Sequence, residues 1–442
     1  MKFFQHITDE EDCLESYSFL GLTLFERATV NYKRARIWSN KPLKKMYKRF
    51  IGRIVYKAKY YNVNGLFKRE ITLFSIPIIG TLKLNGYKLY FILGIKVYSK
   101  PLKFLSDFEA ECLKELDKRY DDIYIILHHL GDAFRMLTLI KEIIKNRQSK
   151  NPLIMVFDDS FEDLVRMMNL GVPYIKIQTT KPFKKRMETQ FSKDEFSYGG
   201  YRFYLLWNNW WSNVKYPKIN KSLPVGTHSI DVQAAAQNVS YDGHSMGKIS
   251  ILKDKEKTML EKSYQAGLNL ENFIFIAPES FALAMYSDNF WEELTRSLQS
   301  SGYDIFVNTV SCKEVMMKNS YANNKSRVTN IDNLDNVKSF FLTVGEAYAL
   351  ACKAKKIITA RSGFSEMLVQ TEVPLCVIYT GANLENVERI KKTGTVMMSP
   401  FASPNKIKEI NVVGMSVNDS IKAVTEALDI KICRTYKNNF SL

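Results

Sequence analysis

The sequence has few cysteines, and none of them has the spacing of a metal site or a disulfide framework. Six are present, none in a CxxC pair, at positions 13, 112, 312, 352, 376 and 433. Cysteines that are so few and so far apart are typical of free thiols in a reducing compartment, and they argue against a zinc ribbon or a disulfide-rich secreted domain. HExxH motifs and close His/Cys clusters are also missing. We therefore expect no metal.

Long apolar runs and nucleotide-binding loops are missing too. The chain has no uncharged apolar run of about eighteen residues, so we expect no transmembrane helix. Its first residues, MKFFQHITDEEDCLESYS, are rich in acids and have no apolar core, which argues against a secretory signal. Neither GxxxxGK[ST] nor GxGxxG occurs. A P-loop and a dinucleotide cofactor therefore have no support, and no cofactor is expected.

Positive charge is abundant but confined to one part of the chain. Residues 31–103 contain 18 lysines and arginines and a single acid, Glu70, which accounts for the whole formal net charge of +17. A local excess of this kind indicates an anionic partner for that part alone. Two partners are open, an anionic membrane surface and a protein that the segment docks to. A nucleic acid is not expected, because no nucleic-acid-binding motif is present.

The basic part also has its own pattern. Three stretches resemble one another, FLGLTLF at 19–25, LFSIPII at 73–79 and FILGIKVY at 91–98, and Asn85-Gly86 is typical of a tight hairpin turn. We therefore predict a module of β-hairpins. The stretch 41–61 mixes lysine and arginine with tyrosine and phenylalanine, and we predict that it is a basic helix suited to an anionic membrane surface.

From about Phe104 onward, apolar strands alternate with amphipathic helices. Continuous apolar strands of this kind predict parallel sheets that are buried on both faces, and therefore an α/β protein with two Rossmann-like halves and a cleft between them. A less regular, aromatic-rich stretch at 180–265 separates the halves. We expect strands at 122–129, 152–157, 173–178, 272–278, 303–308, 339–343, 356–360 and 374–379 and helices at 132–147 and 416–429. The predicted domains are 1–103, 104–265 and 266–442.

In the first half, a strand runs directly into Gly131-Asp132 and a helix. Ligands of such sheets bind at the carboxyl ends of the strands, where Asp132 is expected to lie. Two roles are open for Asp132, that of a helix N-cap and that of a general base. Gly131 permits a tight turn, and His129 either lines the mouth of the cleft on the acceptor side or packs against its neighbours.

In the second half, Arg361-Ser362-Gly363 follows a strand and opens a helix. Free N–H groups at a helix start, a glycine and an arginine together favour a diphosphate. Two further residues have open roles: Ser280 is a phosphate donor or a loop hydroxyl, and Glu346 binds ribose or is a first-turn acid favoured by the helix dipole.

These motifs resemble the heptosyltransferase family of lipopolysaccharide synthesis. The strand followed by Gly-Asp and a helix, the turn IAPES before FWEELTRSL, and TARSGFSEMLVQTEVPLCVIY carry the resemblance, which covers about 105–430. It implies a GT-B fold and transfer of a sugar from a nucleotide donor. The N-terminal hairpins look like extensions of bacterial surface-polysaccharide glycosyltransferases.

The resemblance also implies roles for individual residues. The family's Gly-Asp aspartate, the general base, falls on Asp132. Its Asp-x-Gly-Leu turn at the donor phosphates falls on Arg361 to Phe364, with arginine in place of aspartate, and its histidine falls on Glu366. Arg361 is then expected to stabilise the leaving diphosphate, in a metal-independent, inverting transfer.

The expected reaction is transfer of a hexose or heptose from a nucleotide-diphosphate donor to a lipopolysaccharide, capsule or related glycan, including lipid-linked ones. The expected place is the cytoplasm, peripheral to the inner face of the cytoplasmic membrane through residues 31–103. Two alternatives are open. One is a non-catalytic GT-B-like protein that binds a glycan or a partner at the membrane, and the other is a sugar-nucleotide epimerase.

Overall fold

The structure is a computed structural model, and parts of the chain are described in it. These are residues 4–9, 14–19, 22–31, 44–50, 53–63, 66–73, 76–84, 87–93, 95–101, 108, 112–126, 130–178, 195–206, 230, 233–234, 237–240, 249–278, 288–308, 334, 336–379 and 406–431. Within the first nine strands, side chains are described only at 79–81, 88–93 and 95–100. Two compact units divide the chain: the first is Met1–Leu127, Lys150–Phe157 and Ile175–Tyr216, and the second is the remainder.

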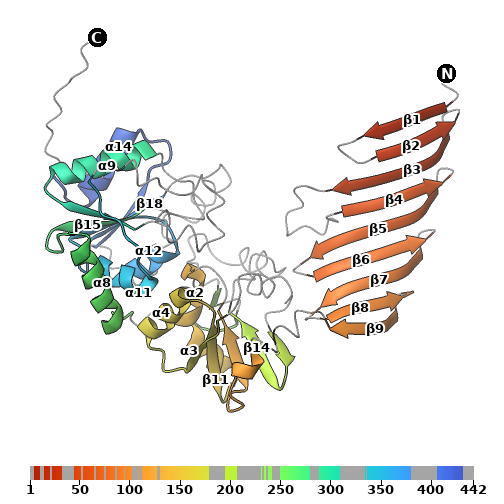
Figure 1. Ribbon diagram of the computed structural model, residues 1–442, viewed down its shortest axis with the longest axis horizontal. Coiled ribbons are helices and arrows are strands. Elements are labelled where there is room, and N and C mark those ends of the chain that lie inside the picture. Colours follow the sequence, from red (N-terminus) through yellow and green to blue (C-terminus); the bar gives the residue numbers. More distant parts are fainter. Residues whose placement is uncertain are drawn as a thin grey trace, which may run out of the picture. The chain divides into compact units, whose positions relative to one another are not determined.

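The N-terminal part is a nine-stranded sheet in which each strand pairs with the next (Figure 1). All eight pairings are antiparallel. The strands are β1 (Phe4–Asp9), β2 (Leu14–Phe19), β3 (Leu22–Asn31), β4 (Lys44–Phe50), β5 (Arg53–Val63), β6 (Leu66–Leu73), β7 (Ile76–Leu84), β8 (Tyr87–Ile92) and β9 (Ile95–Pro101). The predicted hairpins are therefore present. The predicted helix at 41–61 is wrong, because this stretch forms β4 and β5.

The three similar apolar stretches each span one hairpin. Phe19 pairs with Leu22, Leu73 with Ile76, and Ile92 with Ile95, with two residues between the partners in every case. Asn85-Gly86 separates β7 from β8, as its turn chemistry predicts. The three stretches therefore resemble one another because each forms a tight hairpin.

The first unit also contains a five-stranded sheet in the order β12-β11-β10-β14-β13. Its strands are β10 (Asp122–Ile125), β11 (Pro152–Val156), β12 (Tyr174–Lys176), β13 (Glu195–Tyr198) and β14 (Tyr201–Leu205). Strand β10 lies parallel to both β11 and β14, whereas β13 is antiparallel to β14. Phe108 and Cys112 pack on one face of this sheet in an apolar core with Ile123, Met155 and Phe203.

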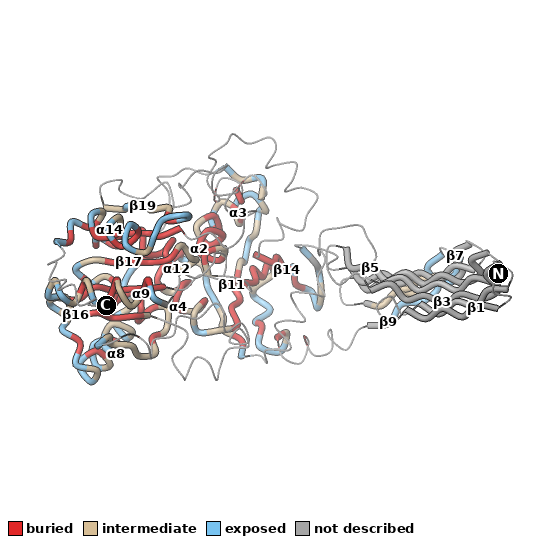
Figure 2. Tube along the Cα trace, turned by 90° about the horizontal axis from the view of Figure 1, so that it is seen from above, coloured by how far each residue is buried: buried red, intermediate tan, exposed pale blue. Residues whose placement is uncertain are grey.

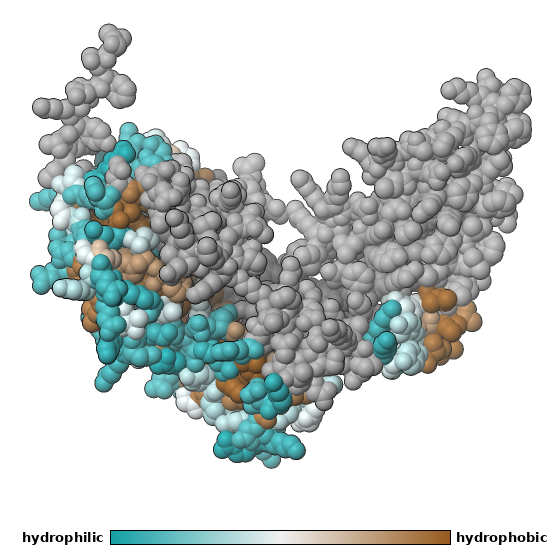
Figure 3. Space-filling view, in the orientation of Figure 1, coloured by the Kyte–Doolittle hydropathy of each residue, from teal (hydrophilic) through white to brown (hydrophobic). Residues whose placement is uncertain are grey.

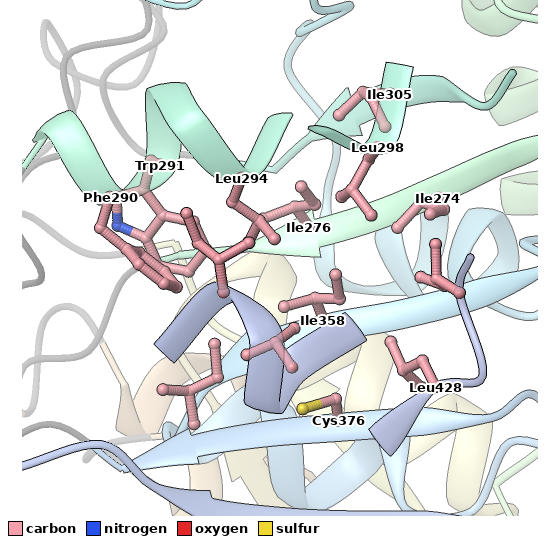
Figure 4. Packing of buried hydrophobic residues seen from close by; sticks show 14 of the residues in the cluster. Ile274, Ile276, Phe290, Trp291, Leu294, Leu298, Ile305, Ile358, Cys376 and Leu428 are labelled. Carbon is pink, nitrogen blue, oxygen red and sulfur yellow. The ribbon is translucent and has the colours of Figure 1, made fainter. Parts of the chain in front are cut away.

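The second unit contains an all-parallel sheet in the order β16-β15-β17-β18-β19. Its elements are β15 (Phe273–Ala277), α9 (Asp288–Ser300), β16 (Asp304–Val307), β17 (Lys356–Ala360), β18 (Leu375–Tyr379), β19 (Ile407–Asn411) and α14 (Val417–Ala427). Phe290, Trp291 and Leu294 of α9 pack on Ile276 and Ile358 of the sheet (Figure 4). Strands β15 and β18 are buried along their whole length. Their neighbour β17 is largely buried as well, and it is drawn mostly in red in Figure 2.

Two parallel-type sheets with interspersed helices confirm the predicted α/β class and the two Rossmann-like sheets that a GT-B fold requires. The other helices described in the second unit are α2 (Leu130–Thr138), α3 (Ile140–Asn146), α4 (Asp159–Met168), α8 (Lys253–Gln265), α11 (Val344–Ala351) and α12 (Gly363–Leu368). Helix α2 packs against α12, and α11 packs against both α4 and α8. The predicted domain boundaries stay predictions.

Several predicted elements need correction. The predicted helix 132–147 is two helices: α2 begins at Leu130, and α3 begins at Ile140. The predicted strand at 339–343 is absent: the stretch beside it forms one isolated bridge, between Lys338 and Phe306. Regular structure also occurs in the stretch predicted to be irregular, as the β13–β14 hairpin and helix α8. Among the described residues, no helix is long and apolar enough to cross a membrane.

Candidate functional site

The two glycines of the predicted corners contact each other in the second unit. A Cβ atom added to Gly131, in α2, would lie 2.7 Å from the Cα atom of Gly363, at the start of α12. One added to Gly363 would collide with the backbone nitrogen of Gly131. Only glycine permits this approach of two helix starts, so Gly131 is needed for packing. The predicted turn before it lies outside the described residues.

Four charged side chains form a network beside this contact. Arg135, on α2, donates from Nη1 to both carboxylate oxygens of Glu366, on α12, at 2.5 Å each. Nη2 of Arg135 bonds to the carboxylate of Asp132, three residues earlier on α2. Nη2 of Arg361 bonds to Glu366 Oε1 at 3.1 Å. Glu366 is therefore held between two guanidinium groups that come from separate parts of the chain.

The network is largely shielded from water. The exposed fraction is 5% for the side chain of Glu366, 10% for Arg135, 12% for Arg361 and 14% for Asp132. Burial lowers the pKa of Arg135, but the charges of Glu366 and Asp132 outweigh it, so the pKa of this guanidinium is raised and it stays charged. The Nε atoms of Arg135 and Arg361 are buried and have no hydrogen-bond partner in the described part of the chain.

Asp132 lies in the first turn of α2, not at its N-cap, because the helix begins two residues earlier, at Leu130. The N-cap interpretation of Asp132 is therefore wrong, and its role as a base stays a prediction. His129, expected on the acceptor side, and Ser280, expected near the donor, lie outside the described residues.

The second corner has the predicted local form. Ser362 is the N-cap of α12: its hydroxyl accepts from Ser365 N at 3.2 Å, and its own N–H donates to Ser365 Oγ at 2.9 Å. The ring of Phe364 lies 6.3 Å from that of Phe275, on β15. The space beside Gly363, where a phosphate was expected to approach the backbone, is occupied by the backbone of Gly131. Contact of residues 362–364 with a phosphate stays a prediction.

Glu346 forms a capping box at the start of α11. Its carboxylate accepts from Thr343 N at 2.7 Å, and the Thr343 hydroxyl accepts from Glu346 N. Lys262 of α8 adds an ion pair with Glu346 at 2.9 Å. This agrees with the first-turn acid that the helix dipole favours, and the binding of ribose by Glu346 stays a prediction.

Arg135 was not predicted from the sequence as a member of the site. Its spacing of three residues from Asp132 on one helix is a signal for an ion pair, but nothing in the sequence links it to Glu366. Tyr379, at the end of β18, was also missed. Its hydroxyl donates to Glu409 at 2.5 Å, and burial first, then Glu409, raises the pKa of Tyr379.

No group of three or more metal-binding side chains occurs among residues that the structure describes. The cysteines in this part, Cys112, Cys352 and Cys376, are not joined in disulfides. Burial raises the pKa of the Cys352 thiol to about 11, which makes it a poor nucleophile near neutral pH.

Alanine at position 363 is expected to lower the free energy of unfolding by about 1–3 kcal/mol, because its Cβ overlaps backbone atoms of Gly131, which shift less easily than a flexible side chain. Gly345→Ala is the comparison, since its Cβ would meet side-chain atoms of Asp163 and Lys255 at 3.1 Å, which have to give by only a few tenths of an ångström. Chemical denaturation of both variants measures the difference. A Gly363→Ala protein as stable as the wild type would contradict the helix contact.

No protein-family model and no curated protein matches the chain. Several solved structures are similar to it. The ADP-heptose lipopolysaccharide heptosyltransferase II of E. coli aligns with 13% identity over 70% of this chain and 98% of its own, with a TM-score of 0.44.

Two others are similar at a comparable level. A family 9 glycosyl transferase of Veillonella parvula aligns with 13% identity over 72% of this chain and 93% of its own, with a TM-score of 0.40. The E. coli heptosyltransferase WaaC with ADP aligns with 10% identity over 69% and 99%, also with a TM-score of 0.40. Two of the three are heptosyltransferases.

Proposed function

We propose that the chain is a glycosyltransferase that moves a hexose or heptose from a nucleotide-diphosphate donor to a surface glycan, such as lipopolysaccharide or capsule, or its lipid-linked precursor. The observation that supports this most is the meeting of the two predicted corners. Asp132 and Arg361 were assigned to base and donor roles from separate motifs, and both belong to one buried network. The reaction is inverting and needs no metal.

The charges of the network support a separate role for each residue. Asp132 takes the proton of the acceptor hydroxyl, and Arg135 holds its carboxylate in place. Arg361 faces the donor diphosphate, on which negative charge grows as the bond to the anomeric carbon breaks. Because Arg361 is paired with Glu366 in the free protein, donor binding has to replace that carboxylate.

Arg361→Ala is expected to weaken binding of a nucleoside diphosphate by about 1.5–3 kcal/mol, the usual value of a charged hydrogen bond. Binding of the nucleoside without phosphates should hardly change. Isothermal titration calorimetry with the diphosphates of adenosine, uridine and guanosine, and with the nucleosides, gives both values. Equal losses for a diphosphate and its nucleoside would mean that Arg361 supports the fold and not the donor.

A second function has its own support, that of a non-catalytic protein with a GT-B-like fold that binds a glycan or a partner. Arg135 and Arg361 both pair with carboxylates inside the protein, and the glycine contact holds the two corners together. Ion pairs and close packing that only stabilise the contact between two helices have the same features. Turnover of a nucleotide sugar separates the two functions, because a stabilising contact alone gives none, and turnover without an acceptor would point to an epimerase.

We also propose that residues 31–103 bind the anionic inner face of the cytoplasmic membrane. The end of the nine-stranded sheet formed by β8 and β9, where side chains are described, supports this. Lys88, Tyr90 and Ile92 alternate along β8 and therefore share a face, and their partners on β9 are Lys100, Tyr98 and Ile95. The face thus grades from cations, through two tyrosines, to isoleucines, which suits the headgroups and acyl chains of an anionic bilayer.

Exposure of this face is high. Ile95 is 69% exposed, Tyr98 58% and Ile92 49%, and Figure 3 shows the apolar residues of this end gathered together in brown. The rings of Tyr90 and Tyr98 lie 5.6 Å apart, and Lys88 Nζ lies 4.8 Å from the centre of the Tyr90 ring. Cations and aromatic rings side by side on an exposed face are typical of a segment anchored at the membrane–water interface.

Ile95→Asp is expected to lower binding to anionic vesicles several-fold at low salt, because a carboxylate replaces an apolar contact and is repelled by the lipid charge. Tyr264→Asp, at an 87% exposed residue of the second unit, makes the same change of charge elsewhere and should bind as the wild type does. Co-sedimentation with phosphatidylserine and phosphatidylcholine vesicles measures this, and about 1 M salt should release the protein. Equal binding to both lipids, or to neither, would leave a protein-docking module.

A further inference from the structure

Two guanidinium groups converge on one carboxylate inside the protein. Arg135 donates to both oxygens of Glu366, and Arg361 donates to one of them. Arginine presents five N–H donors in a planar fork, which fits the oxygens of carboxylates and phosphates. Glu366 therefore occupies a position where two forks can hold an anion.

The carboxylates present do not use all the donors. Nε of Arg135 and Nε of Arg361 are buried without a hydrogen-bond partner among described residues, and Arg135 as a whole is 9% exposed. A buried charged donor without a partner is costly, so an added anion that reaches these atoms gains hydrogen bonds. A diphosphate carries more acceptor oxygens and more charge than one carboxylate.

We infer that Arg135 and Arg361 form a two-arginine site for the diphosphate of a nucleotide ligand, in which Glu366 is the internal occupant that the ligand replaces. The inference rests on the proposed function, to which it adds Arg135 as a second cation and Glu366 as an intramolecular competitor. Asp132 stays paired with Arg135 when Glu366 leaves, so the base remains in place.

The competition has a direct consequence. Glu366→Gln keeps the shape of the side chain and removes the charge that competes with phosphate. Binding of inorganic pyrophosphate should then tighten by at least about tenfold, because a unit charge a few ångströms away is worth more than that even at an effective dielectric constant near 20.

Asp163→Asn is the matched control. Asp163 is also a buried carboxylate of the second unit, 1% exposed, and it pairs with Lys255 at 3.0 Å and accepts from Gly345 N at 3.0 Å. The Asp163→Asn substitution removes one negative charge from the same unit, but that charge does not contact the two arginines. Pyrophosphate should therefore bind this variant as it binds the wild type.

A double variant tests Arg135 itself. Arg135→Met with Glu366→Gln removes one charge of each sign, so the net charge of the network is unchanged and the protein should fold. We expect it to lose the tightening that Glu366→Gln alone produces. Thermal unfolding of each variant confirms that the comparison is between folded proteins.

The experiment is calorimetric titration of these proteins with pyrophosphate and with the diphosphates of adenosine, uridine and guanosine. Tightening in Glu366→Gln only, lost in the double variant, supports the site. A Glu366→Gln protein that binds no tighter, a control that tightens equally, or a double variant that binds as Glu366→Gln does would overturn it.

The titration also separates this inference from the proposed function. If a nucleoside diphosphate binds the wild type and Glu366→Gln does not tighten it, the two-arginine site is wrong and the proposed function stands. If pyrophosphate behaves as expected and no nucleoside diphosphate binds, the anion site stands and the glycosyltransferase does not. Failure of every probe with every variant overturns both.

Discussion

Replacing Asp132 by asparagine is expected to lower sugar transfer on the order of 100- to 10,000-fold, the usual contribution of a positioned general base. Asparagine keeps the size of the side chain and can still accept a hydrogen bond from Arg135, which remains paired with Glu366. Because Asp132 pairs with Arg135, loss of its charge should not weaken donor binding, so the transfer rates are compared at saturating donor. Release of nucleoside diphosphate in the presence of acceptor measures the transfer rate.

The control for this variant is Asp163→Asn, which alters a buried carboxylate of the same unit away from the network. It should transfer sugar at close to the wild-type rate. An Asp132→Asn protein that is folded and equally active would show that Asp132 serves only to pair with Arg135.

Arg135→Met is expected to lower the free energy of unfolding by about 3–5 kcal/mol. It leaves Asp132 and Glu366 as largely buried carboxylates, and removing one partner of a buried ion pair costs about this much. Lys422→Met removes the same charge from an exposed pair with Glu426, whose side chains are 63% and 67% exposed. That change should cost no more than about 1 kcal/mol.

Chemical denaturation followed by circular dichroism gives both free energies. If the two variants lose equal stability, the Arg135 network does not hold α2 and α12 together. Adding Glu366→Gln to Arg135→Met should recover part of the loss, because it removes one negative charge and restores the neutral net charge of the four-residue network.

The core strands were predictable from the sequence because apolar burial leaves a plain pattern. Strands β11, β15, β17 and β18 lie where continuous apolar runs predicted them. Helix α8 was missed for the opposite reason: only Met259 and Ser263 of its residues are buried, so its apolar periodicity is weak. The stretch 339–343 is apolar yet not a strand, and Phe340 packs against Phe306 from outside the sheet.

The N-terminal sheet was predicted only in part. The turn residues Asn85-Gly86 and the similar apolar stretches indicated hairpins correctly. The stretch 41–61 misled because lysine and arginine are good helix formers, whereas its tyrosine, isoleucine and valine residues favour strands. In the structure, pairing with neighbouring strands decides the outcome, since Lys44–Phe50 pairs with both β3 and β5.

The site was predictable corner by corner but not as a network. Asp132 and Arg361 each follow a strand, which is a local signal. The contact between Gly131 and Gly363, and the pairing of Arg135 with Glu366 across 231 residues of sequence, depend on how helices pack, which no local pattern encodes. Glycine at both corners was therefore assigned to turns and phosphates, when each glycine also serves the other.

The most direct test of the proposed function is thermal unfolding of the full chain with a panel of nucleotide sugars that vary in base and sugar. A donor that binds the folded protein only, at about 100 times its dissociation constant, stabilises it by about 2.7 kcal/mol, which raises the midpoint by several degrees. The account predicts such a rise for at least one nucleotide sugar and none for the free sugars. No rise with any member of the panel would contradict a glycosyltransferase and leave a non-catalytic binding protein.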